Sequence, residues 1–191
     1  MPTRAEILEI LAASQTQVLA FFAGLSPHDL ERPATASELA GAAPWSAKDH
    51  LAHLVNSERN IQRVLRAAHA GAPRAALLRL QYPADMPLPR VLGAWEALSP
   101  AEQERLEVAV ARRNQAYVHA HHDDSLELIA AAYQAARQET VALVQELSED
   151  QLAAALPLVT GSQVTGDVVA GRAEHAARHL SWIEEGWRQG V

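Results

Sequence analysis

Four long segments of the chain place apolar residues three or four positions apart, the spacing of an amphipathic helix. Each segment is free of proline after its first turn, and they span residues 3–23, 45–70, 125–147 and 165–187. Such a stripe covers one face of a helix, so each segment is expected to bury that face against the others. The pattern predicts a bundle of four helices, and no alternation typical of strands is found.

Polar residues at the start of these segments are helix start signals. Thr3 followed by Glu6 is a capping-box pattern, in which side chains satisfy the free backbone donors. Ser46 suits the N-cap of the second segment, and Asp49 in its first turn suits the positive end of the helix dipole. A further helix is predicted after Ser99, because a proline follows at the first helical position.

The stretch between the second and third segments departs from this pattern. Residues 72–124 hold half of the ten prolines, together with Tyr82, Trp95 and Tyr117. We interpret the stretch as a partly helical insertion that packs on the bundle, covers the open end of its site and shapes substrate choice. The 191 residues are expected to form a single domain over 1–191.

Composition and charge exclude several classes of function. The 16 Lys and Arg against 23 Asp and Glu give a net charge of −7, which argues against binding nucleic acid. The absence of cysteine excludes disulfides, iron–sulfur clusters, thiolate-bound zinc and a cysteine nucleophile. No uninterrupted apolar run is long enough to span a membrane, and the N-terminus has no signal-peptide pattern. We therefore expect a cytoplasmic protein that acts on a small molecule, with no nucleic-acid or membrane partner.

Two of the nine histidines fall on the apolar face of the last segment. His175 and His179 are four residues apart and therefore share a helix face, which is also the face of Val168 and Ile183. An imidazole directed into a helical core needs a partner for a ring nitrogen. A shared metal ion would supply one, but on this spacing alone two packed histidines are the simpler interpretation.

A third histidine could complete a metal site. His53 lies at the edge of the apolar face of the second segment, where its side chain can reach a seam of the bundle. With His175 and His179 it would give three nitrogen ligands and leave a position open for water or substrate, as catalytic zinc sites do. The other histidines are expected on helix flanks or in solvated loops: His28, His50, His69, His119, His121 and His122.

Glu58 and Arg137 are further candidates for the site. Glu58 lies near the middle of the apolar face of its segment, and a buried carboxylate needs a partner. The interpretation we favour is an ion pair between the two residues. The alternative is catalytic: Glu58 accepts a proton near the metal, and Arg137 binds a substrate carboxylate.

Short motifs, in their order along the chain, carry a resemblance to a known family. The second segment contains WSAKDHLAHL (45–54) followed by Glu58, and the last contains EHAARHL (174–180). Between them lie NQAY (114–117), SLE (125–127) and LSEDQL (147–152). This series resembles the DinB/YfiT-like metalloenzyme superfamily, which includes mycothiol- and bacillithiol-dependent enzymes, and in particular its ClbS/DfsB-like branch.

The resemblance implies an all-α, up-down-down-up four-helix bundle with the insertion between helices two and three. It implies a divalent metal bound by His53, His175 and His179, each of which falls on the family motif. Zinc or nickel suits three imidazoles best, with iron, cobalt and manganese as further candidates. Such a site would activate a small thiol, as in a thiol S-transferase, or water, as in a hydrolase. A homodimer is also implied, and a non-catalytic metal- or small-molecule-binding protein stays open as the alternative.

Overall fold

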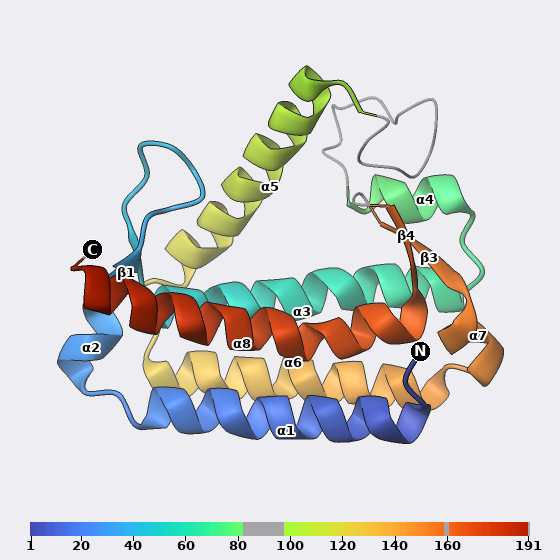
Figure 1. Cartoon of the computed structure of the whole chain (residues 1–191), viewed down its shortest axis with the longest axis horizontal. Helices are drawn as coiled ribbons and strands as arrows, with labels where there is room; N and C mark the ends of the chain where they lie inside the picture. Colours follow the sequence, from blue (N-terminus) through green and yellow to red (C-terminus); the bar gives the residue numbers. More distant parts are fainter. Residues whose placement is uncertain (82–97, 159–160, 191) are drawn as a thin grey trace.

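The computed structural model describes residues 1–81, 98–158 and 161–190 (Figure 1). Its main body is a bundle of four long helices: α1 (Arg4–Ala23), α3 (Ala47–His69), α6 (Leu126–Glu146) and α8 (Thr165–Gln189). Helices α1 and α8 run in one direction and α3 and α6 in the other, which is the up-down-down-up arrangement (Figure 1). The fold class expected from the sequence is confirmed.

Shorter elements connect and extend the bundle. They are α2 (Pro27–Glu31), β1 (Pro33–Thr35), β2 (Trp45–Ser46), α4 (Arg74–Arg79), α5 (Pro100–Ala120), α7 (Glu149–Ala153), β3 (Ala155–Leu158) and β4 (Gly161–Val164). Strands β1 and β2 pair antiparallel, as do β3 and β4. The expectation of no strand is therefore wrong, because strands of two to four residues are too short to show the alternation that identifies a strand in a sequence.

The expected helix start signals are present in the structure. Thr3, Ser46 and Ser99 each form a capping box with the acidic residue three positions later. These contacts satisfy backbone donors that the first turn of a helix leaves free. In α3 the capping box fixes where the helix begins, and thereby places His53 two turns further along.

The core of the bundle consists of two apolar clusters with a polar layer between them. One cluster includes Ile7, Leu11, Leu65, Val144 and Val169, and the other includes Val18, Phe22, Leu51, Ile129 and Ile183. At the level between them, each long helix contributes a polar residue: Ser14, Glu58, Arg137 and Arg172. The candidate site lies beside this layer.

The described part of the insertion consists of α4 and α5. Helix α5 packs against α3, and its N-terminal end points away from the bundle (Figure 1). Asn114 and Tyr117 of α5 bond to Asn56 and Arg59 of α3. Tyr82 and Trp95, which the sequence analysis placed in the insertion, lie outside the described residues.

Among the described residues, α1 is long and apolar enough to cross a membrane, as judged by length and composition. The buried core helix of a globular protein satisfies the same criteria. In the structure α1 packs against α8 and α6 and places Ile7, Leu11, Val18 and Phe22 in the core.

Candidate metal centre

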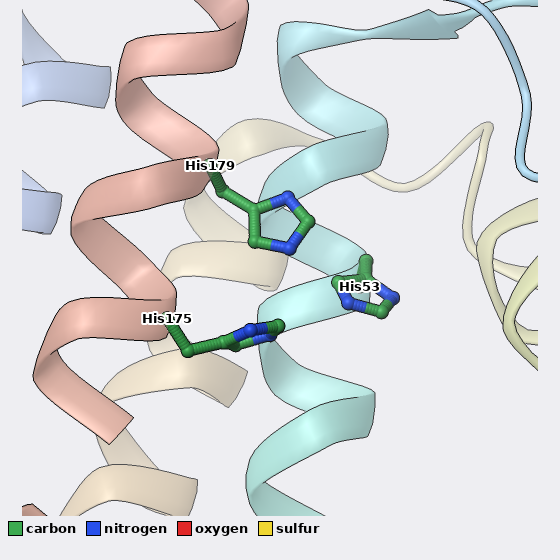
Figure 2. Close-up of side chains that lie close together, drawn as sticks. All are labelled: His53, His175 and His179. Atoms are coloured by element: carbon green, nitrogen blue, oxygen red, sulfur yellow. The ribbon is translucent and has the colours of Figure 1, made fainter. Parts of the chain in front are cut away.

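Three histidines from two helices converge in the bundle (Figure 2). His53 comes from α3, and His175 and His179 from adjacent turns of α8. One ring nitrogen from each residue lies within 4.8 Å of the corresponding nitrogens of the other two. The three residues that the sequence placed together are therefore close enough to share one metal ion.

Burial keeps all three imidazoles neutral. It is the largest cause that lowers the pKa of His53 to about 3 and that of His175 to about 2, and it also lowers the pKa of His179. Nearby cationic groups act in the same direction, with Arg172 among them in each case. A neutral imidazole is the form that binds a metal, so the cluster is in the required state at neutral pH.

Two ring nitrogens of the cluster are buried without a partner. Nδ1 of His53 and Nε2 of His175 make no hydrogen bond to any described residue. A buried polar atom left unsatisfied costs about 1–3 kcal/mol. A divalent cation at the cluster would take one nitrogen from each imidazole, and imidazole nitrogen is a common ligand of zinc, nickel, copper and iron. The donor set therefore fits a divalent transition metal.

His50 is a buried neighbour of the cluster that the sequence analysis assigned wrongly to a helix flank. Its side chain is 1% exposed, because β1 and α8 cover the first turn of α3. His50 Nδ1 lies 2.8 Å from His179 Nδ1, and His50 Nε2 lies 3.0 Å from the Thr35 hydroxyl. Residues three apart share a helix face, so its spacing from His53 was the signal available in the sequence.

The hydrogen bond between His50 and His179 occupies Nδ1 of His179 and leaves its Nε2 for the cluster. If His179 donates from Nδ1, its Nε2 carries a free lone pair, and His50 in turn donates from Nε2 to Thr35. Metal-binding histidines are commonly oriented in this way by a partner on the other ring nitrogen. His179 is therefore a candidate ligand whose orienting contact is already formed.

Glu58 and Arg137 form the expected ion pair. Their charged groups are 3.2 Å apart, and both side chains are almost completely buried. Thr140 donates a hydrogen bond to Glu58 at 2.7 Å, and Arg172 forms a second ion pair with it at 3.4 Å. The sequence analysis missed Arg172. Neither Glu58 nor Arg137 lines the pocket beside the histidines, and their catalytic roles stay a prediction.

A pocket of about 450 Å³ opens beside His53 and His175. Glu38 and Leu80, which are exposed, lie at its rim, so the pocket reaches the surface. Three residues of α5 line the pocket: the apolar Val110 and the polar Arg113 and Asn114. Part of the insertion therefore lines the pocket beside the histidines. Its roles as a cover of the site and in substrate choice stay predictions.

The remaining histidines with described contacts bond elsewhere. His121 pairs with Asp124, His122 with Asp49, and His69 with the Gln151 side chain. They lie outside the three-histidine cluster, as the sequence analysis expected. His121 and His122 therefore serve as controls for the site.

The comparison with protein families agrees with this geometry. The family model described as the DinB superfamily matches residues 40–183. The matched range includes α3, most of α8 and all three histidines. The chain belongs to the DinB superfamily, and the match does not distinguish its branches. No curated protein and no solved structure matches the chain.

Proposed function

We propose that the chain is a divalent-metal-dependent enzyme in which His53, His175 and His179 hold the ion. The observation that carries this proposal is the convergence of three imidazoles, with one ring nitrogen of each within 4.8 Å of the others, beside a pocket lined by His53 and His175. The family and the donor set support the same function. Zinc and nickel are the ions we expect first.

The three ligands are neutral, so they leave the charge of the ion uncompensated. When bound, the ion supplies a Lewis acid that favours the anionic form of a small thiol or of water at neutral pH. The apolar cluster that includes Leu51, Ile129 and Ile183 excludes water from one side of the site. The surrounding side chains hold the imidazoles in fixed orientations. The pocket accepts a small electrophilic molecule beside His53 and His175.

Two reaction types use this site, a thiol S-transferase and a hydrolase. Because the chain contains no cysteine, a sulfur nucleophile would have to come from a low-molecular-weight thiol. The alternative of a non-catalytic binding protein predicts a site closed to solvent, and the exposed rim of the pocket favours the enzyme. The homodimer and the cytoplasmic location stay predictions.

Metal analysis tests the first part of this proposal. Protein purified without a histidine tag should contain about one equivalent of metal per chain. His53→Ala, His175→Ala and His179→Ala should each lose most of it, because two imidazoles hold the ion much less tightly than three. Circular dichroism should show the helices retained.

His121→Ala and His122→Ala are the matched controls and should keep the full metal content, since both residues bond outside the cluster. Full metal retention by a His175→Ala, His179→Ala double variant would refute the assignment of the ligands.

Cobalt(II) substitution separates the two reaction types. A small thiol that enters the site should produce a sulfur-to-cobalt charge-transfer band, and His179→Ala should abolish it. A thiol panel that gives no band, together with hydrolysis of activated esters without thiol, favours the hydrolase. If neither occurs at full metal content, the non-catalytic alternative is the better account.

A further inference from the structure

One guanidinium of the pocket has no acidic partner among the residues that the structure describes. Arg113 of α5 lines the pocket together with His53 and His175. Its Nε is buried and makes no hydrogen bond to any described residue, and none of the ion pairs between described residues involves Arg113. Burial, followed by the charge of Arg63, lowers the pKa of Arg113, but an arginine remains charged at neutral pH.

The polar layer beneath the histidines adds a second excess of positive charge. The single carboxylate of Glu58 pairs with both Arg137 and Arg172, which leaves this buried group one charge positive. Arg172 also lines the pocket.

The negative charge in the pocket does not offset this excess. Glu38 is the carboxylate among the described lining residues, and it lies at the exposed rim, where it accepts a hydrogen bond from Asn114 at 2.9 Å. Two cationic residues, Arg113 and Arg172, therefore line the pocket against one carboxylate of the described residues, that of Glu38. A charge that is partly buried and unpaired is costly, so this arrangement favours an anion as the ligand.

Part of the remaining wall is apolar, although the polar residues Ser57, Asn60 and Gln81 also line it. Ile61 and Val64 of α3, Val110 of α5 and Val168 of α8 line the pocket. Such a surface suits a hydrocarbon body, while a guanidinium suits the paired oxygens of a carboxylate or a phosphate-type group.

We infer that the pocket binds a small organic anion, whose charged group lies between Arg113 and Arg172 and whose reacting part lies toward the three histidines. This inference rests on the proposed function, because it assigns the substrate class of the same site. It also moves the anchoring role that the sequence suggested for Arg137 to Arg113, since Arg137 is fully buried and paired with Glu58.

Calorimetric titration of zinc-loaded protein tests the inference with three probes of the same size. The probes are 3-phenylpropanoate, its neutral amide, and 2-phenylethylphosphonate, which separates a carboxylate from a phosphate-type anion. We expect at least one of the two anions to bind tenfold or more tightly than the amide. Equal affinities for all three, or no binding of either anion, would overturn the inference without the need for any variant.

Arg113→Gln should reduce the affinity for the anion to the level of the amide and leave the metal content unchanged. Arg112→Gln is the matched control, because it removes the same charge from the neighbouring, exposed position of α5, and it should stay within twofold of the unaltered protein. Full anion affinity in Arg113→Gln would show that the anion is held without Arg113 and would refute the anchor.

Metal analysis of the same samples distinguishes this inference from the proposed function. A metal-loaded protein with no preference for anions refutes the anion site alone. A protein that takes up no metal but still prefers the anion refutes the metal-dependent function and leaves the anion site in place.

Discussion

At the scale of single residues, hydrogen-bond partners determine which ring nitrogens are free to bind a ligand. His179 contacts His50 through Nδ1, and His50 contacts Thr35 through Nε2. Burial lowers the pKa of His50 to about 4, so it is neutral and can accept a hydrogen bond from His179. His50 is therefore placed to fix the orientation of one ligand without binding the metal itself.

His50→Ala should weaken metal affinity by about 10- to 100-fold, the effect typical of removing an outer hydrogen-bond partner of a metal ligand. The competing chelator concentration at half-loss of the metal measures this change. His50→Gln, whose amide can replace the ring as an acceptor, should recover part of the affinity. His122→Ala is the control, and equal affinity in His50→Ala and His122→Ala would show that His50 has no orienting role.

The sequence predicted the three clustered histidines better than their surroundings. His175 and His179 follow from helical spacing, and His53 from the family motif, because both signals are local in the chain. The contacts of His50 with β1, of Arg172 with Glu58 and of Arg113 with the pocket join elements far apart in sequence. They depend on the register between helices, which a single sequence does not reveal.

At the scale of elements, the four long helices were predicted to within two residues of their observed ends, because stripes and capping residues mark them locally. The polar layer was predicted in part. The sequence identified Glu58 and Arg137 as polar residues on inner helix faces. That they lie in one layer with Ser14 and Arg172 depends on how the four helices pack. The short strands β1 and β2 have no comparable signal.

A close approach between α8 and β1 is important for the site. Gly186 lies so near to β1 that an added Cβ would be 1.5 Å from the carbonyl oxygen of Ala34. The next residue, Thr35, is the partner of His50. A glycine at this point therefore allows β1 to lie close enough for Thr35 to contact His50.

Gly186→Ala should lower the free energy of unfolding by about 1–3 kcal/mol, the usual cost of overpacking, because backbone atoms cannot move aside as a side chain can. Urea denaturation measures this change. Gly171→Ala is the control on the same helix, where an added Cβ meets no atom within 4 Å. It should be neutral or stabilising by up to about 1 kcal/mol, and similar losses in both variants would contradict the explanation.

At the scale of the whole molecule, the bundle is built from two helix pairs. The most extensive contacts join α3 to α6 and α1 to α8, whereas α3 and α8 contact one another much less. The three histidines lie across this weaker seam, with His53 on α3 and the other two on α8 (Figure 2). An ion bound there would connect the two pairs.

Metal removal should therefore destabilise the whole fold. A ligand that binds only the folded state stabilises it by about 2.7 kcal/mol when its free concentration is 100 times its dissociation constant. Urea denaturation of zinc-loaded protein, with and without a chelator, should show a loss of this order. His179→Ala should unfold at the same urea concentration in both conditions, because it does not bind the ion that joins α3 to α8. A chelator effect of equal size in the variant would place the stabilising ion elsewhere.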